Sequence, residues 1–451
     1  MRAALAQGRP RRAGCLLAAL GLLAAGCAEA RRPSFVLVVV DTLRADHLAP
    51  DAPSPTPRVA ALARQGSWFR RAFATAPWTL PSVASLFTSQ LGSEHRAVRW
   101  GNRLAPERES LAEVLRAHGY RTASFTSNVL LGRETGLDQG FEVYELLFSP
   151  AAAGLPPGEP FPNAAAERVG SAALAWLRQI RAEEPGAPFF AYLHLMEPHT
   201  PYLCPDPPDP DCRARADALN RRLLAEQWGF AEDEQELIRR LYREDVARVD
   251  RFLGRLVRAF AGADLWRDTW LVLTSDHGEQ LGEVGAWLHG KSLDQREIHV
   301  PLLISGPDRS ARVVDDTVSL LDVAPTLLDL AGIERPAGFR GRSLVPALSG
   351  APLSPAPAIA ELFQTTRDAP RHRLAVLAGD RKLVLSPGGD VARLDLGADP
   401  GEAEPRPATR SELSRALGPR EGFIDLGAPA PAADLSSETR ALLRALGYAA
   451  D

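Results

Sequence analysis

The sequence is poor in several features that would direct it toward particular classes of protein. Its 451 residues contain only four cysteines and no excess of positive charge, since 52 lysines and arginines face 56 acidic residues. The net charge of −4 gives no electrostatic reason to expect a nucleic-acid partner. No apolar run reaches the roughly 20 residues that a membrane-spanning helix needs, and the chain has no internal repeat. What remains is a globular protein with length for one large domain and a smaller one.

The first 27 residues have the features of an export signal. Four arginines precede a short apolar run, Cys15–Ala25, which is the order found in a secretory signal. The run ends in Leu22–Cys27, which resembles a bacterial lipobox, so residues 1–26 are expected to be removed and Cys27 to carry a lipid. A plain secretory signal and an uncleaved anchor are the alternatives. The sequence therefore predicts a lipoprotein of the bacterial cell envelope that faces the periplasm and contacts the membrane through its lipid anchor.

Two cysteines, Cys204 and Cys212, remain after the signal, and they flank a short loop rich in proline and aspartate. An oxidising compartment would allow them to form a disulfide. A zinc pair is the weaker interpretation, because no neighbouring histidine or cysteine completes the ligand set.

Apolar, β-branched runs alternate with helix-like segments along most of the chain. Strands are predicted at 34–41, 122–126, 189–195, 270–274 and 301–305, and helices at 57–65, 80–88, 111–117, 164–182, 232–260 and, for the most part, 316–330. This alternation predicts an α/β fold with a mainly parallel sheet covered on both faces.

The last hundred residues have a different pattern. A proline-rich stretch at 351–357 suggests a boundary, and Gly379-Asp380 between two apolar runs is a hairpin signal. We therefore predict a main domain over 34–350, a small antiparallel subdomain over 351–405, and an irregular tail over 406–451. That tail is expected to end in a helix at 436–446.

Polar residues follow several of the predicted strands: Asp41, Asn128, His199, Asp276 and His277. In open α/β sheets ligands bind at the carboxyl ends of the strands, and aspartate with histidine is a set that holds a divalent metal. Each residue also has a simpler explanation. Asp41 would cap the following helix, His199 would lie in a surface loop, and the Asp-His-Gly sequence would form a turn.

A candidate nucleophile, Thr79, immediately precedes a predicted helix. At a helix N-terminus, free N–H groups and the helix dipole favour an anionic substrate, and a bound metal would activate the hydroxyl. The alternative is that Thr79 or Ser82 only caps this helix.

These residues carry a family resemblance. The sequence resembles the sulfatase family of the alkaline-phosphatase superfamily in an ordered series of motifs: Val40–Leu48, Thr79–Thr88, Gly119–Ala123, His194–Tyr202, Thr274–Glu279, Val300–Ile304, Asp322–Thr326, Leu394–Leu396 and Asp399–Glu402. The resemblance covers residues 34–402. It implies an alkaline-phosphatase-like three-layer sandwich, with catalysis in the 34–350 domain.

The resemblance also implies roles for single residues. The implied metal ligands are Asp41, Asp276, His277 and Thr79, around one divalent ion that would be Mn, Ca, Zn or Mg. Thr79 falls at the nucleophile position. The residues implied in contact with the substrate anion or its leaving group are Asn128, His199, His289 and Lys291. His289 and Lys291 both lie near the position of a family lysine that binds the anion or the leaving group, and the sequence does not decide between them.

Three departures from the family pattern bear on the reaction. The second of two consecutive aspartates is Thr42, the nucleophile position holds Thr79 instead of cysteine or serine, and an expected arginine is Val83. Sulfatases convert the cysteine or serine to formylglycine, and threonine does not undergo that conversion. Threonine nucleophiles in this superfamily are associated with phosphoryl transfer through a phosphothreonine.

The leading hypothesis is therefore a metal-dependent hydrolase or transferase that acts on phosphate esters or diesters. A sulfuric ester hydrolase in the strict sense is the second hypothesis. The third is a catalytically degenerate lipoprotein that binds an anion or glycan. All three take an anionic ester or glycan as partner, and the sequence leaves the oligomeric state open.

Overall fold

The computed structural model describes residues 32–48, 56–147, 165–205, 210–308, 310–365 and 370–418. The predicted signal at 1–26, the lipidation site Cys27 and the predicted helix at 436–446 lie outside these residues. No helix among the described residues is long and apolar enough to cross a membrane.

The central element of the fold is a mixed sheet, with eight strands in the described part of the chain. Their spatial order is β10-β2-β9-β6-β1-β5-β3-β4. In chain order the bounds are β1 Ser34–Val40, β2 Ser67–Phe73, β3 Arg121–Thr126, β4 Val143–Leu146, β5 Phe189–Leu195, β6 Thr269–Thr274, β9 His299–Ser305 and β10 Arg312–Ser319. Neighbours pair in parallel, except that β9 is antiparallel to both β2 and β6. The prediction of a mainly parallel sheet is confirmed.

The central strands are buried on both faces, as their continuous apolar sequences require. Every residue of β1 and β5 is buried. Alternate residues of β1 belong to two different cores: Phe35, Leu37 and Val39 to one, and Val36, Val38 and Val40 to the other. This period of two places one apolar layer on each side of the sheet.

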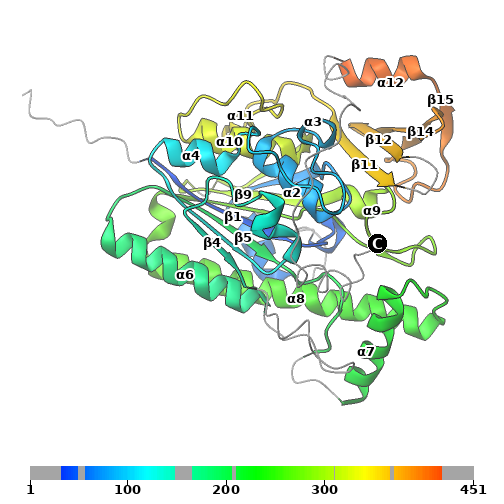
Figure 1. Cartoon of the computed structure of the whole chain (residues 1–451), viewed down its shortest axis with the longest axis horizontal. Coiled ribbons are helices and arrows are strands. Elements are labelled where there is room, and N and C mark those ends of the chain that lie inside the picture. The colour runs from blue at the N-terminus through cyan, green and yellow to red at the C-terminus, as the bar shows by residue number, and fades with distance from the viewer. Residues whose placement is uncertain are drawn as a thin grey trace, which may run out of the picture. The chain divides into compact units, whose positions relative to one another are not determined.

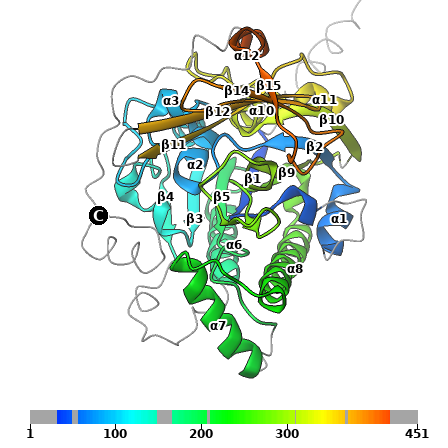
Figure 2. The same cartoon turned by 90° about the vertical axis from the view of Figure 1, so that its right-hand side faces the viewer.

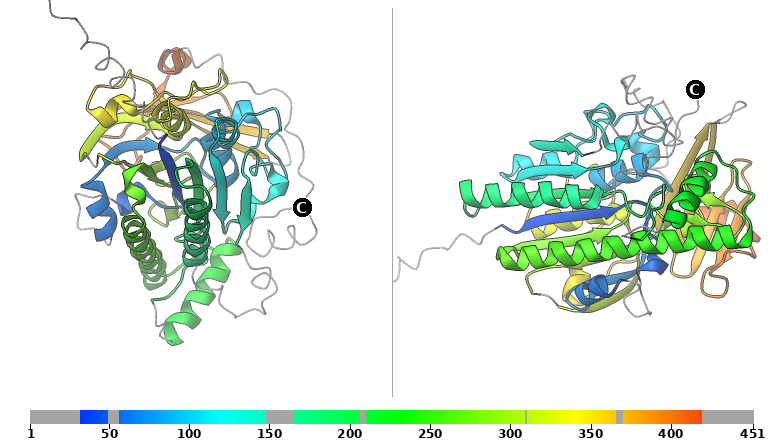
Figure 3. Two further views of the ribbon diagram at one scale, coloured as in Figure 1. Left: turned by 90° about the vertical axis from the view of Figure 1, so that its left-hand side faces the viewer. Right: turned by 90° about the horizontal axis from the view of Figure 1, so that it is seen from below.

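Helices complete the two outer layers (Figure 1). One layer contains α2 Thr79–Thr88, α4 Leu111–Ala117, α10 Val323–Leu330 and α11 Val345–Ser349, and the other contains α1 Pro57–Ala63, α6 Ala165–Glu183 and α8 Glu232–Gly262. The long helices α6 and α8 run along the sheet side by side, as Figure 3 shows from below. This is the three-layer sandwich that the sequence predicts.

Shorter elements lie in the connections. They are α3 Gly92–His95, α7 Pro210–Leu224, α9 Gln295–Ile298, and the two-residue strands β7 Gln280–Leu281 and β8 Trp287–Leu288. A disulfide joins Cys204 to Cys212, the two cysteines that the sequence pairs.

A second sheet follows near the C-terminus (Figure 2). Its antiparallel strands are β11 Ala358–Thr365, β12 Pro370–Ala378, β13 Arg381–Leu385, β14 Val391–Asp395 and β15 Arg406–Ala408. Its core meets the large domain, since Leu91 and Leu321 cluster with Ile359 and Leu374.

Two sequence predictions are wrong in detail. Residues 406–418, expected to be irregular, form β15 and helix α12, Arg410–Leu417. A capping box stabilises that helix: Thr409 Oγ1 accepts from the amide of Glu412 at 3.2 Å, and the Glu412 carboxylate accepts from the amide of Thr409 at 2.9 Å.

The segment 316–330, expected to be largely helical, begins in β10, because Val314 and Val318 are buried where that strand pairs with β2.

Candidate active site

The strands β1, β3, β5 and β6 end at the same edge of the sheet. Their parallel register pairs Val39 with both His194 and Thr274, and Thr126 with His194. The polar residues that follow these ends are therefore brought together. Asp41 directly follows β1, and Asp276 lies two residues beyond β6.

The centre of the site is a pair of buried carboxylates. Asp41 and Asp276 are both fully buried. Oδ2 of Asp41 lies 2.6 Å from the Asn128 amide nitrogen, which donates to it, and 3.1 Å from Nε2 of His194. Oδ1 of Asp41 and Oδ2 of Asp276 have no hydrogen-bond partner among the described residues. Asp41 therefore does not cap a helix, and two carboxylate oxygens are left without a donor.

His277 lies between these two carboxylates. Its Nε2 is 3.5 Å from Oδ1 of Asp41 and 3.5 Å from Oδ2 of Asp276. Its Nδ1 lies 2.9 Å from the carbonyl oxygen of Gly278, which requires the proton on Nδ1. The Nε2 lone pair therefore faces the carboxylates, an arrangement that is repulsive without a cation.

The donor set fits a divalent metal. Two orphaned carboxylate oxygens and an imidazole lone pair converge in a buried space, where unpaired charge is costly. Asp41, His194 and Asp276 also each offer an atom within 4.8 Å of the others. Mixed oxygen and nitrogen ligands suit several ions, so the set indicates a divalent metal without selecting one.

The electrostatics of the two carboxylates differ. Burial raises the pKa of Asp276 well above its ordinary value, and the charge of Asp41 raises it further. Burial also acts to raise the pKa of Asp41, but electrostatic interactions with His199 and His277 and a hydrogen bond from His194 outweigh it and hold that pKa low. One carboxylate thus stays ionised while the second resists ionisation until a cation joins it.

The candidate nucleophile Thr79 lies beside this centre. It is fully buried in the first turn of α2, and its Oγ1 is 3.4 Å from Nε2 of His277 and 3.4 Å from Nδ2 of Asn128. The N-cap of the helix is Trp78, which makes no side-chain cap. Ser82 donates from Oγ to the carbonyl of Asp276 at 2.6 Å. The interpretation of Thr79 or Ser82 as a mere cap is therefore wrong.

Two further histidines pack against the centre. His199 is buried, and its ring centroid lies 5.0 Å from that of His289, which in turn is 4.4 Å from that of His277. Nδ1 of His289 lies 2.8 Å from the buried carboxylate of Glu279, which also accepts from the hydroxyl of Tyr202 at 3.0 Å. Burial raises the pKa of Glu279 to about 8 and lowers that of His289 to about 4.

The structure separates His289 from Lys291, which the sequence leaves as alternatives. Nζ of Lys291 lies 2.7 Å from the carboxylate of Glu226 and 4.0 Å from the ring centroid of Trp228. His289, not Lys291, packs against the histidines of the site.

Two residues of the site lack a role in the sequence prediction. His194 contacts Asp41, and Glu279 contacts His289. His194 lies within the apolar run of β5. A polar residue near the carboxyl end of a buried strand is the sequence feature that could have indicated a role for it in the site. Glu279 lies directly after the Asp-His-Gly sequence, where its charge alone does not reveal burial.

The glycine of the Asp-His-Gly sequence is explained by a close backbone approach. The amide of Gly278 donates to the carbonyl of Glu297 at 2.8 Å. A Cβ at position 278 would lie 2.1 Å from the carbonyl oxygen of Arg296. Only glycine allows this segment to hold His277 and Asp276 in place.

Position 42, where the family pattern has a second aspartate, has an unusual backbone. Thr42 has φ 58°, a left-handed conformation that β-branched residues rarely adopt. The hydroxyl of Tyr242 donates to its carbonyl at 2.8 Å, and the side-chain Oγ1 is buried without a partner among the described residues. The site therefore has one carboxylate fewer than the family pattern.

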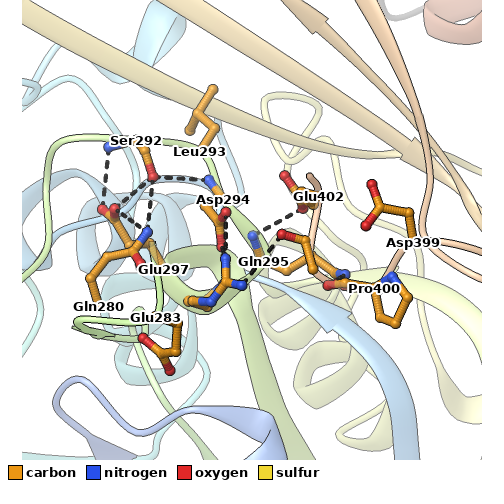
Figure 4. Close-up of polar contacts among 12 residues, drawn as sticks. Gln280, Glu283, Ser292, Leu293, Asp294, Gln295, Glu297, Asp399, Pro400 and Glu402 are labelled. Atoms are coloured by element: carbon orange, nitrogen blue, oxygen red, sulfur yellow. Dashed lines mark hydrogen bonds and ion pairs between the residues drawn. The ribbon is translucent and has the colours of Figure 1, made fainter. Parts of the chain in front are cut away.

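The segment after His289 is held by the second sheet (Figure 4). The buried carboxylate of Glu297 accepts from the hydroxyl of Ser292 at 2.6 Å. Glu402, in the turn after β14, accepts from the amide of Gln295 at 3.1 Å. Lys382 of β13 donates to the carbonyl of Leu293 at 2.5 Å and to both oxygens of Glu402 at 2.7 Å. We call Lys382 and Glu402 the loop clamp.

A model of the sulfatase family matches residues 33–333, more than half of the chain. The chain belongs to the sulfatase family. Among curated relatives of this sulfatase-family chain, mouse arylsulfatase K is 28% identical over 327 residues, which cover 63% of this chain and 58% of the mouse protein. The multifunctional alkaline phosphatase superfamily protein PehA of Trinickia caryophylli is 28% identical over 403 residues, with 70% and 77% covered. The chain thus spans less than two thirds of the mouse relative.

Solved structures share the fold of this family member. The phosphonate monoester hydrolase of Agrobacterium radiobacter superposes with a TM-score of 0.70 at 24% identity, covering 87% of this chain and 95% of that one. A structure in complex with its substrate D-glucosamine-2-N,6-O-disulfate gives a TM-score of 0.72 at 18% identity, covering 87% and 98%. At these identities the likeness concerns the fold alone.

Proposed function

We propose that the protein is a metal-dependent hydrolase or phosphotransferase of phosphate esters or diesters that uses Thr79 as its nucleophile. The observation that carries the proposal is the position of Thr79 Oγ1. It lies 3.4 Å from both His277 Nε2 and Asn128 Nδ2, in the first turn of a helix whose N-terminus has no side-chain cap. The name of the phosphonate monoester hydrolase with a similar fold adds support.

The chain's own groups supply the steps. Thr79 Oγ1 forms a bond to phosphorus as the bond from phosphorus to the leaving oxygen breaks, and the hydroxyl proton passes to Asp276, the buried carboxylate that interacts with Thr79. The amides of Thr79 and Leu80, which precede Pro81 at the start of α2, and the Asn128 amide bind the non-bridging oxygens. Glu279, whose raised pKa of about 8 keeps it protonated near neutral pH, can pass its proton through His289, which lies beside His199, to the leaving oxygen.

Asp41, Asp276 and His277 would hold the metal, with Thr79 beside it. A divalent ion bound there would polarise the phosphoryl group and ease deprotonation of the hydroxyl. In the second half of the reaction, water or an acceptor alcohol attacks phosphorus and the bond to Thr79 Oγ1 breaks. The donor set leaves Mn, Ca, Zn and Mg as candidates, and metal titration of the stripped protein would decide among them.

The test is a comparison of Thr79→Ala and Thr79→Ser on aryl phosphate monoesters, diesters and aryl sulfates. We expect Thr79→Ala to lose at least about a thousandfold in kcat, because the nucleophile is absent. Thr79→Ser should retain part of the activity. Thr88→Ala is the matched control, since Thr88 ends the same helix and bonds to Ala84 at 2.7 Å. Unchanged phosphoesterase activity in Thr79→Ala would sink the mechanism.

A sulfuric ester hydrolase is the second candidate. Mouse arylsulfatase K and the structure that binds a disulfated glucosamine support it by name. Turnover of the aryl sulfate in preference to both phosphate esters would favour it. The third candidate, a degenerate anion- or glycan-binding protein, predicts tight binding of phosphate or sulfate without turnover under any of the four metals.

We also propose that the chain is a periplasm-facing lipoprotein anchored at Cys27. The Cys204–Cys212 disulfide supports export, because such bonds persist in oxidising compartments. Cys27→Ala should move the expressed protein from the membrane fraction to the soluble fraction. Membrane retention of that variant would contradict the lipid anchor.

A further inference from the structure

A second histidine, His194, lies beside the carboxylate pair, and two roles are open to it. It could be a metal ligand, since it lies within 4.8 Å of the ligand atoms of Asp41 and Asp276. We propose that it is instead a positioning residue, fixed by Tyr192, which turns Asp41 toward the metal. The proposal rests on the metal site of the proposed function and not on which ester the protein cleaves.

The proton positions follow from the contacts. Nε2 of His194 lies 3.1 Å from Oδ2 of Asp41, a carboxylate oxygen that also accepts from Asn128. A lone pair at that distance from an anionic oxygen would be repelled, so Nε2 carries the proton and donates it. Nδ1 then holds the lone pair and accepts from the hydroxyl of Tyr192, which lies 2.8 Å away. Burial raises the pKa of Tyr192 well above its ordinary value, in keeping with a permanent donor.

The same contacts decide which oxygen of Asp41 is available. Oδ2 accepts from both His194 and Asn128, at 3.1 and 2.6 Å. Two donors engage the lone pairs of that oxygen and fix the plane of the carboxylate. Oδ1 has no partner among the described residues and lies 3.5 Å from Nε2 of His277. The carboxylate is thus held with one oxygen committed to protein donors and the other directed at the metal site.

His194 and His277 therefore have opposite tautomers and different tasks. His277 donates from Nδ1 to Gly278 and offers the Nε2 lone pair, as a ligand must. His194 donates from Nε2 and has used its lone pair on Tyr192. Donors that orient a ligating carboxylate in this way are worth about 10- to 100-fold in metal affinity. The effect matters more here because Thr42 supplies no second carboxylate.

The test is calorimetric titration of Mn²⁺ into metal-stripped protein, with no substrate present. His194→Ala should weaken binding by about 10- to 100-fold. His194→Gln, whose amide can reproduce the Nε2 donor, should stay within about threefold of wild type, and Tyr192→Phe should fall between them. Tyr144→Phe is the matched control, because the buried Tyr144 hydroxyl donates to the Leu131 carbonyl.

A spectroscopic readout separates positioning from ligation. In the Mn²⁺-loaded protein, nitrogen hyperfine coupling should persist in His194→Ala and disappear in His277→Ala. Loss of that coupling in His194→Ala, or a loss of affinity in His194→Gln as large as in His194→Ala, would make His194 a ligand and overturn the proposal. Wild-type affinity in His194→Ala would overturn it as well. A wild-type protein that binds no divalent metal would refute the proposed metal centre and this role together, whereas absent phosphoesterase activity would leave both intact.

Discussion

Removal of the buried charge at Lys382 is the perturbation that best probes how the second sheet supports the site. Lys382 is fully buried, and its Nζ is within 2.7 Å of both Glu402 oxygens. Lys382→Met keeps the length of the side chain and removes the charge. The Glu402 carboxylate, whose side chain is 7% exposed, then has no cation.

The expected loss is large because an uncompensated carboxylate stays buried. Breaking one partner of a buried ion pair costs about 3 to 5 kcal/mol, whereas removing both charges is close to neutral. We therefore expect Lys382→Met to lose about 3 kcal/mol or more in the free energy of unfolding. The double variant with Glu402→Gln should lose no more than about half of that.

Urea unfolding of the three variants measures these free energies. Arg215→Met is the matched control, since its ion pair with Asp233 spans 3.1 Å with side chains 48% and 74% exposed, and exposed pairs contribute about 1 kcal/mol or less. Lys382→Met should also lower turnover of esters with poor leaving groups more than turnover of esters with good ones. The reason is that the loop clamp holds the segment that follows His289, and His289 is proposed to deliver the proton to the leaving oxygen. A loss for Lys382→Met no greater than that for Arg215→Met would refute the reasoning.

Three further predictions concern single positions. Gly278→Ala should destabilise the protein by at least about 2 kcal/mol and weaken metal binding, because its Cβ would lie 2.1 Å from the Arg296 carbonyl oxygen. Burial raises the pKa of Glu297 to about 7 from 4.5, so the folded state holds this proton more tightly than the unfolded chain. The stability of wild type relative to Glu297→Gln should be highest below pH 4.5 and fall by about 3 kcal/mol as pH rises through 7. Cys204→Ser should cost about 2 to 3 kcal/mol, because it opens the short loop that Cys212 closes.

Each of these predictions has its own check. Urea unfolding and calorimetry of Gly278→Ala are compared with Gly262→Ala, where a Cβ meets nothing within 4 Å; equal behaviour would contradict the steric explanation. Stability curves of wild type and Glu297→Gln that run parallel from pH 4 to 8 would contradict the pKa argument. Reduced wild type should have the same melting temperature as Cys204→Ser. A difference between the two melting temperatures would point to a contact other than the disulfide.

The parts of the fold that the sequence predicts are those in which local pattern and burial agree. The run at 34–41 is apolar throughout and becomes the central strand β1. The sequence does not reveal strand β10, because this strand lies at the sheet edge, where exposed Val313 and Asp315 alternate with less exposed residues. Asp315 and Asp316 resemble a helix start, and only pairing with β2 selects the strand.

The residues of the site also fall into those that the sequence predicts and those that only tertiary contacts reveal. Asp41, Asn128 and Asp276 are predictable, because parallel topology alone brings strand ends together. The choice between His289 and Lys291 is not, since the two lie one residue apart and only tertiary packing turns one inward. The role of His194 also depends on contacts with residues far away in sequence, so no local pattern contains it.

The backbone at position 42 has a consequence for engineering. Its φ of 58° is one that aspartate and asparagine adopt several times more readily than threonine. Thr42→Asp would therefore relieve local strain while adding a second carboxylate next to Asp41. Without a metal the new charge would be buried beside another anion, and with a metal it would become a ligand. A single substitution would thus make the stability of the fold depend more strongly on the bound metal that the proposed function requires.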